Sequence, residues 1–332
     1  MKALLVKSPG DFALVEIDAP EIRDDEVLVR PLMVGMCGTD LELIDGTIDP
    51  AYVNYPLVLG HEWVGEIRKN VAGVATAGDR VVVEGVVPCG VCDECRRGDT
   101  NRCVTYDEIG FTRAGAIAQS IAVPSRLVHR LEPTVNPMDA VLVEPMAVVW
   151  RALTRVPLRS GLRVVVVGDG TIALLATHMI RLFEPSTVVI VGRRDAQRSL
   201  ALEAGADHFT TTEPTERFDL VIEAAGNAAS ASSAIALAAR GAMVILLGLA
   251  THGTVIDVAP DDIVNKDLMI QGSFSYTRTA WAQVVERVNA GDLKPSFLVT
   301  HRFDLDDAIA AIATLRGSVS DREPRGKVVV SI

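Results

Sequence analysis

Several features that would point to other classes of protein are scarce or absent in this sequence of 332 residues. Aromatic residues make up only 5% of the chain, which gives little indication of a pocket for a bulky aryl ligand. The net charge is -11 and no run is rich in lysine or arginine, so nucleic-acid and anionic-membrane binding have little electrostatic support. The apolar runs Val164–Val167 and Val188–Val191 are far too short to cross a bilayer and are typical of buried strands.

The amino-terminal segment lacks the length of apolar sequence and the cleavage site that mark a secretion signal. We therefore expect a cytoplasmic protein. Hydrophobic residues make up 49% and charged residues 23% of the chain, which is the composition of a globular protein with an ample core. The length alone suggests about two domains.

Cysteine is also scarce, and four of the five cysteines lie in one short segment with the spacing C-x2-C-x2-C-x7-C. They are Cys89, Cys92, Cys95 and Cys103. Four thiolates this close in a loop can complete a tetrahedral zinc shell with no open position, which is a structural site. An iron–sulfur cluster is the alternative, because C-x2-C-x2-C also occurs there. The charged residues within the segment and the lack of a proline after its last cysteine favour structural zinc.

The fifth cysteine belongs to a second candidate metal site. The chain reads Cys37-Gly38-Thr39-Asp40 and, further on, Gly60-His61-Glu62. A catalytic zinc takes about three protein ligands and keeps one position open for water or substrate. Cys37 and His61 can supply two of these ligands. A carboxylate, either Glu62 or a later one, can supply the third.

A dinucleotide-binding motif follows in the second half of the chain. Arg163–Val167 is typical of a buried strand, and Gly168-Asp169-Gly170-Thr171-Ile172-Ala173 follows it directly and opens an apolar run of helical length. This is G-x-G-x-x-A in the order strand, turn and helix, which is the context that gives the motif its meaning. Gly168 permits the tight turn, and Gly170 lets the backbone approach a pyrophosphate bound at the helix N-terminus. The candidate cofactor contacts in this motif are Gly168, Gly170, Thr171 and Ile172.

The next strand, Thr187–Val191, predicts which dinucleotide binds. A protein specific for NAD(H) is expected to carry an acidic residue at the end of this strand, where it binds the ribose hydroxyls. The chain has Gly192-Arg193-Arg194 there instead. Two guanidinium groups without a leading acid favour a 2′-phosphate, so we expect NADP(H) to be favoured over NAD(H). The alternative is that both arginines are solvated and that Asp195 or a backbone group binds the ribose.

The remaining sequence divides into a β-rich part and a βαβ part. Up to about Pro145, short β-like runs are broken by turn residues, and near Gly272 the βαβ rhythm stops. Ala225 and Gly248 fall at the ends of two expected strands, where an open α/β sheet presents its ligand crevice, and they are further candidate cofactor contacts. The later expected elements are strands over 219–223, 242–247 and 327–331 and helices over 198–204, 228–239, 281–289 and 306–315.

With Cys37, Gly60-His61-Glu62, the four-cysteine segment and the nucleotide motif in this order, the chain resembles the zinc-dependent medium-chain dehydrogenase/reductase superfamily. It looks most like the branch of polyol (sorbitol), glucose and threonine dehydrogenases. Glu144-Pro145 is similar to the Glu-Pro motif of that branch. The resemblance extends over essentially the whole chain.

The resemblance implies a fold of α/β plus β-rich class, in which a Rossmann domain is inserted into a GroES-like catalytic domain. We expect the catalytic domain to comprise residues 1–148 and 273–332, including the structural zinc lobe at 86–105. The Rossmann domain is then residues 149–272. A carboxy-terminal strand would return to pair within the first domain.

The resemblance also implies roles for single residues. Cys37 and His61 are expected to be ligands of a catalytic zinc. Glu62 is a ligand or a close neighbour of the metal, and Glu144 is the other candidate, bound directly or through water. Thr39 occupies the position whose hydroxyl contacts the reacting oxygen and begins a proton relay. Asp40 either orients His61 or caps the following helix.

These expectations amount to an NAD(P)-dependent alcohol or polyol dehydrogenase with two zinc ions per chain. The expected substrate is a small polar alcohol or ketone of polyol, sugar or cyclitol type, and hydride passes between it and the nicotinamide. Members of the superfamily are usually homodimers or homotetramers. Two alternatives stay open: a threonine-type amino-alcohol dehydrogenase, and a non-catalytic nucleotide-binding protein stabilised by zinc.

Overall fold

The computed structural model describes residues 1–69, 75–250, 253–317 and 323–332. The chain divides into two compact units. The first comprises Met1–Glu144, Thr277–Val319 and Lys327–Ile332, and the second comprises Pro145–Tyr276 and Ser320–Gly326. No helix in the described part of the chain is long and apolar enough to span a membrane.

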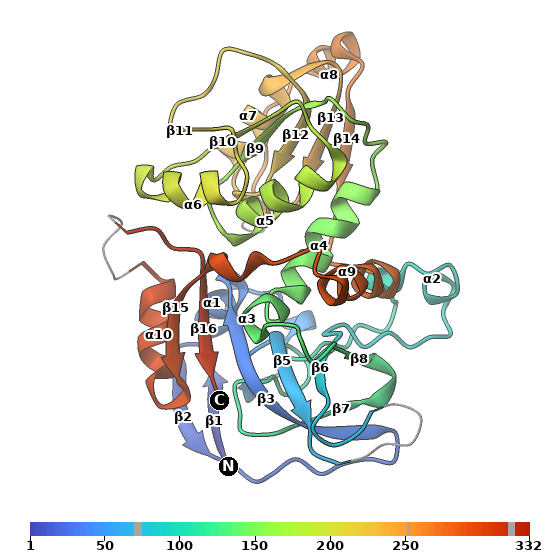
Figure 1. Cartoon of the computed structure of the whole chain (residues 1–332), viewed down its shortest axis with the longest axis vertical. Coiled ribbons are helices and arrows are strands. Elements are labelled where there is room, and N and C mark those ends of the chain that lie inside the picture. Colours follow the sequence, from blue (N-terminus) through green and yellow to red (C-terminus); the bar gives the residue numbers. More distant parts are fainter. Residues whose placement is uncertain (70–74, 251–252, 318–322) are drawn as a thin grey trace. The chain divides into compact units, whose positions relative to one another are not determined.

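The first unit is built on a seven-stranded sheet whose path runs β15-β16-β3-β5-β6-β8, with β7 paired to β3 (Figure 1). Its pairings are antiparallel except between β15 and β16. These strands are β3 Glu26–Met36, β5 Glu62–Ile67, β6 Arg80–Val83, β7 Ile121–Pro124, β8 Val128–Arg130, β15 Val299–Asp304 and β16 Lys327–Ser331. A separate sheet of order β2-β1-β4 contains β1 Lys2–Ser8, β2 Asp11–Glu16 and β4 Leu57–Val58.

The core of the first unit follows from the period of its strands. Along the first half of β3, buried and partly exposed residues alternate, as a sheet with one face against the core requires. The last residues of β3 are all buried, and so are the first four of β5. The helices of this unit are α1 Gly38–Asp45, α2 Asp93–Arg96, α3 Pro137–Ala140, α9 Arg278–Ala290 and α10 Ala308–Leu315; α4 Val143–Thr154 begins here and continues into the second unit.

The second unit is a six-stranded parallel sheet of order β11-β10-β9-β12-β13-β14 (Figure 1). Taken as strands one to six of this unit, that is the order 3-2-1-4-5-6 of a Rossmann fold, so the predicted Rossmann arrangement is confirmed. Its strands are β9 Arg163–Val167, β10 Thr187–Val191, β11 His208–Thr210, β12 Phe218–Glu223, β13 Ala238–Leu246 and β14 Met269–Gly272. Its helices are α5 Thr171–Ile180, α6 Arg198–Glu203, α7 Ala228–Leu237 and α8 Pro260–Lys266.

Candidate metal and cofactor sites

Strand pairing brings Cys37, His61 and Glu62 together. Cys37 directly follows β3, and Glu62, the first residue of β5, pairs with Gly35 of β3. The Sγ atom of Cys37 lies 3.1 Å from Nε2 of His61. A ligand atom from each of the three residues lies within 4.8 Å of the others, so the thiol, imidazole and carboxylate predicted from the sequence converge on one point.

Asp40 supports this group from α1. Its Oδ2 accepts a 2.8 Å hydrogen bond from the backbone N–H of Cys37, and its Oδ1 lies 3.6 Å from Nδ1 of His61. The first contact is that of a helix cap, and the second is longer than a hydrogen bond but places a carboxylate beside the ring. Burial would lower the pKa of His61, but the Cys37 thiolate and the Asp40 carboxylate outweigh it and raise the pKa well above its usual value.

A lysine that sequence reasoning missed completes the group. Lys327, the first residue of β16, donates a 2.5 Å hydrogen bond to Oε2 of Glu62 and a 3.2 Å hydrogen bond to the carbonyl of Met36. The side chains of Lys327 and Glu62 are 1% and 3% exposed. Lys327 therefore holds the carboxylate of Glu62 through one of its two oxygens.

Glu144 and Thr39 lie on helices that begin near the group. Glu144 is in the first turn of α4 and is outside the set of three whose ligand atoms lie within 4.8 Å of one another. Burial, with the nearby charge of Glu62, raises the pKa of Glu144 to about 8. Thr39 is the second residue of α1 and is half-buried. The structure thus makes Glu62 the nearer of the two carboxylate candidates.

A second feature missed in the sequence lies beside His61. The ring of Phe111 is 5.2 Å from the ring of His61, and the same loop carries Tyr106, whose hydroxyl donates to the carboxylate of Glu108. Burial raises the pKa of Glu108, although the charge of His61 and the Tyr106 hydrogen bond oppose the rise. Since Glu108 has no metal-ligand spacing to the other acids, no local pattern could have marked it.

The four clustered cysteines form a second group of donor atoms, all within 4.8 Å of one another. The Sγ atoms of Cys89 and Cys95 are 3.9 Å apart, and none of the five cysteines forms a disulfide. Backbone N–H groups of Cys89, Cys92 and Cys95 point to sulfur atoms at 3.3–3.5 Å. Backbone N–H donors, with Val104 the largest contributor, lower the pKa of Cys92 to about 6 and so favour its thiolate.

The dinucleotide motif forms the predicted turn between β9 and α5. Gly168 has φ +130°, and a Cβ there would lie 3.0 Å from the carbonyl carbon of Ala224, so this position excludes other residues. Gly170 is the N-cap of α5, and a Cβ there would meet nothing within 4 Å. The open space over Gly170 leaves room for a ligand to approach the backbone, and Thr171 and Ile172 begin the helix behind it.

Ala225 and Gly248 follow β12 and β13 and lie close together. Oε1 of Glu223 accepts hydrogen bonds from the backbone N–H groups of Ala225 and Gly226, both at 2.8 Å. A Cβ on Gly248 would lie 2.2 Å from the backbone nitrogen of Gly226. The structure therefore brings both candidates to the carboxyl edge of the parallel sheet, where Rossmann folds bind their ligands.

Arg193 and Arg194 follow β10 as predicted, but their surroundings differ. Arg193 is exposed, whereas the side chain of Arg194 is 10% exposed and pairs with Asp169 of the glycine-rich turn at 3.3 Å. Asp195, the residue offered as an alternative ribose ligand, pairs with Arg198 at 2.6 Å.

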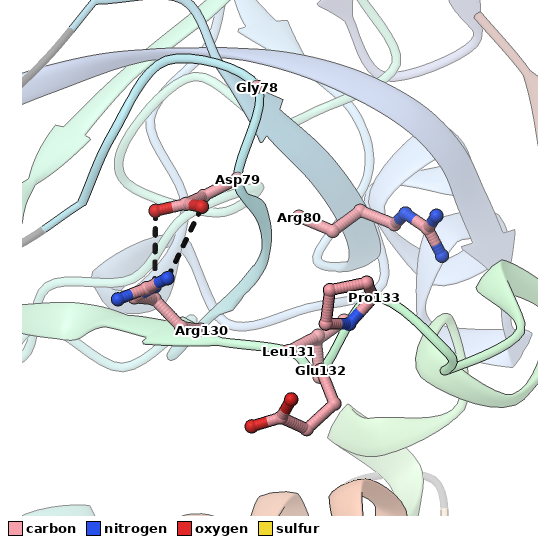
Figure 2. Close-up of a pocket in the computed structure, with 7 residues that line it drawn as sticks. All are labelled: Gly78, Asp79, Arg80, Arg130, Leu131, Glu132 and Pro133. Atoms are coloured by element: carbon pink, nitrogen blue, oxygen red, sulfur yellow. Dashed lines mark hydrogen bonds and ion pairs between the residues drawn. The ribbon is translucent and has the colours of Figure 1, made fainter.

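One open cavity, of about 280 Å³, is lined by residues from β6, β8 and their flanks. Figure 2 shows Asp79 and Arg130 paired across part of it, while Arg80 points away. Its lining contains none of the candidate residues: Gly78, Asp79, Arg80, Arg130, Leu131, Glu132 and Pro133. With its central charges already paired, this cavity adds nothing to the candidate sites.

Comparison with known proteins gives consistent matches over the whole chain. Residues 23–133 match the alcohol dehydrogenase GroES-like domain, and residues 138–320 match the glucose dehydrogenase C-terminus. A sorbitol dehydrogenase of Bacillus subtilis is 28% identical over 92% of this chain and 91% of its own. An L-threonine 3-dehydrogenase of Burkholderia vietnamiensis is 30% identical over 99% of both chains.

A solved structure agrees with these matches. It is described as a zinc-binding dehydrogenase from Sinorhizobium meliloti 1021 bound to NADP. It superposes with a TM-score of 0.92 at 28% identity, over 100% of this chain and 99% of the other. The predicted GroES-like domain is confirmed by the first family match, and the predicted mixed α/β class by the fold.

Proposed function

Because this chain belongs to the polyol dehydrogenase branch of the zinc-dependent medium-chain dehydrogenase/reductase superfamily, we propose that it interconverts a secondary alcohol and a ketone on a polyol, sugar or cyclitol. The observation that carries the proposal is the 3.1 Å approach of the Cys37 sulfur and the His61 nitrogen, with Glu62 beside them. Sorbitol dehydrogenase activity of a relative supports the substrate class. The non-catalytic alternative is not favoured, since the chain belongs to a family of enzymes.

Both donor sets fit zinc. Tetrahedral geometry with usual bond lengths places a zinc-bound sulfur and nitrogen about 3.6 Å apart and two sulfurs about 3.8 Å apart. The 3.9 Å between the sulfurs of Cys89 and Cys95 agrees with this geometry. The 3.1 Å between Cys37 and His61 is shorter, so these two side chains would move slightly apart on binding the ion. We therefore assign a catalytic zinc to Cys37, His61 and Glu62, with Glu144 as the alternative carboxylate, and a structural zinc to the four-cysteine cluster.

The surroundings of Cys37 also favour a cation. The Asp40, Glu62 and Glu144 carboxylates interact within this buried group, and His61 and Lys327 are the positive side chains that oppose their charge. When bound there, zinc would supply a Lewis acid for the substrate oxygen. His61 would bind through Nε2 with its Nδ1 toward Asp40, and Lys327 would hold Glu62 in one orientation.

We assign the transfer of the substrate's alcohol proton to Thr39. A hydroxyl can accept a proton on one side while donating its own on the other, so Thr39 is suited to carry the alcohol proton away from the substrate. The coenzyme contacts are assigned to the turn at Gly168 and Gly170, to Thr171 and Ile172, and to the sheet edge at Ala225 and Gly248. Arg193 and Arg194 support NADP(H), and the assigned domains are residues 1–148 with 273–332, and 149–272.

Zinc content and turnover, measured together, test the proposal. Wild-type protein should hold two zinc ions per chain, and Cys37→Ser should lose one of them with all turnover while retaining its circular dichroism. Cys103→Ser is the matched control, because the same atom is replaced in the other cluster, and it should lose the other zinc. A Cys37→Ser variant that keeps both zinc ions and its activity would contradict the assignment.

A second candidate, the threonine-type dehydrogenase, is kept because of the 30% identity with an L-threonine 3-dehydrogenase. A panel of polyols, cyclitols and L-threonine, assayed with NAD+ and NADP+, separates the two. Turnover of L-threonine at a kcat/KM at least tenfold above every polyol would favour the second candidate.

A further inference from the structure

Asp169, the second residue of the glycine-rich turn, has no role in the dinucleotide motif, yet it makes close contacts. Its Oδ2 accepts hydrogen bonds from the backbone N–H groups of Arg193 and Arg194, both at 2.9 Å. Its Oδ1 lies 3.3 Å from the Arg194 guanidinium. The Asp169 and Arg194 side chains are 14% and 10% exposed, so this ion pair is largely shielded from water.

In most Rossmann folds, the acidic side chain at this position comes from a different strand from the one that precedes Asp169. In the usual Rossmann pattern an acidic side chain at the end of the second strand binds the ribose. Here that strand, β10, is followed by Gly192, and a Cβ on Gly192 would lie 2.6 Å from the Phe209 ring and 2.9 Å from Cβ of Asp169. The carboxylate at the end of β10 therefore comes from the glycine-rich turn, and Gly192 leaves the space for it.

The position of Asp169 is also fixed through its backbone. The buried Gln197 side chain donates a 2.6 Å hydrogen bond to the Asp169 carbonyl. The carboxylate consequently has little freedom to turn away from Arg194. Among the described residues, Arg193 has no ion-pair partner for its guanidinium, so the two arginines that the sequence treats as equivalent are not equivalent.

We propose that Asp169 sets the coenzyme preference by withholding Arg194 from a 2′-phosphate. Arg193 is then the residue that binds the 2′-phosphate, and the preference for NADP(H) over NAD(H) is weaker than two arginines alone would give. This inference rests on the proposed function in one respect, that a nicotinamide dinucleotide binds at this turn.

The experiment compares the affinities of adenosine 2′,5′-bisphosphate and AMP, which differ only in the 2′-phosphate, by isothermal titration calorimetry. Asp169→Asn removes the charge but keeps an oxygen for the two N–H groups. It should raise the ratio of affinities in favour of the bisphosphate by at least tenfold. Asp195→Asn is the matched control, because it removes an equal charge from the neighbouring turn and leaves the Asp169–Arg194 pair intact. It should change the ratio less than twofold.

The gain must also depend on Arg194. In the Asp169→Asn/Arg194→Gln double variant the ratio should return to that of Arg194→Gln alone. An unchanged or lower ratio in Asp169→Asn, or a gain that survives in the double variant, would overturn the inference. If Asp169→Asn does not fold, the single variants decide: Arg193→Gln should lower the ratio at least fivefold more than Arg194→Gln, and equal losses would overturn the inference. Failure of the wild type to bind either nucleotide or NAD(P)+ would instead refute the proposed function.

Discussion

Replacement of Lys327 by methionine tests whether the buried ion pair with Glu62 is part of the metal site. The Nζ–Oε2 distance is 2.5 Å and both side chains are almost fully buried. Methionine preserves most of the packing volume but leaves the Glu62 carboxylate without its cation. Breaking one partner of a buried pair costs about 3–5 kcal/mol, because the remaining charge is uncompensated. With a urea m-value of about 3 kcal/mol per M, the unfolding midpoint should fall by about 1–2 M.

The loss should depend on metal. In zinc-free protein Glu62 is balanced by Lys327 and by the His61 imidazole, whose pKa is raised, whereas bound zinc would supply two further positive charges. Urea unfolding, followed through the fluorescence of the buried Trp63 and Trp281, should therefore show a large loss in EDTA and less than half of it after zinc loading. Lys2→Met is the matched control, because Lys2 pairs with Asp306 at 2.6 Å with side chains 42% and 67% exposed. Exposed pairs contribute little, so the midpoint of this variant should stay close to the wild type.

The sign of the pH dependence gives a further check. Burial alone would lower the pKa of Lys327, but the charges of Glu62 and Cys37 outweigh it and the pKa is raised. A group with a raised pKa in the folded state stabilises fully below its unfolded pKa, about 10.4 for lysine, and the contribution is lost as the pH rises through the folded value. The deficit of Lys327→Met should thus be constant from pH 7 to 9. If Lys327→Met is no less stable than Lys2→Met in EDTA, Glu62 does not carry the charge assumed here.

Two other perturbations concern the second unit. The hydrogen bond from Arg163 lowers the pKa of Asp219, so the stability that the ionised Asp219 contributes is present above about pH 4 and is lost as the pH falls through the lowered pKa. In thermal unfolding, Asp219→Asn should therefore be less stable than the wild type at pH 6, and the difference between their midpoints should close toward pH 2. An equal difference in midpoint at both pH values would contradict this pKa-linked stabilisation. Gly168→Ala should lower the thermal midpoint and coenzyme affinity together, because the new Cβ meets the Ala224 backbone at a positive φ. Gly170→Ala is its control: it should weaken coenzyme binding at least tenfold and leave the midpoint unchanged, since its Cβ points into open space.

Regular patterns of apolar residues were sufficient to predict most strands of the Rossmann unit. The expected strands at 163–167 and 187–191 agree with β9 and β10, because a buried parallel strand has a continuous apolar sequence whose ends are marked by polar or glycine residues. Residue types also singled out the three candidate metal ligands Cys37, His61 and Glu62, which the structure brings together. Family resemblance, rather than spacing, was needed to name Thr39 and Glu144.

The ends of helices and strands that depend on tertiary structure could not be predicted as well from the sequence. The expected helix over 228–239 ends at Leu237, and β13 begins at Ala238 instead of 242, because extended backbone at Ala238 ends the helix inside a run of alanines. Alanine is a strong helix former, so nothing in the local sequence marks that change. At α9 the helix begins at Arg278 rather than 281, since the Thr277 side chain caps it by accepting from the N–H of Ala280.

The Lys327–Glu62 pair shows why the candidate metal site could be recognised only in part. The two residues are 265 positions apart, so no local spacing relates them. What joins them is β3, which pairs with β16 on one side and β5 on the other, with Val328 opposite Met36 and Glu62 opposite Gly35. A Cβ on Gly35 would lie 2.7 Å from Oε2 of Glu62 and 3.3 Å from Cδ of Lys327. The ion pair therefore crosses β3 at Gly35, the one residue of that strand without a side chain. A glycine inside a buried strand was the only local sign of this close contact in the sequence.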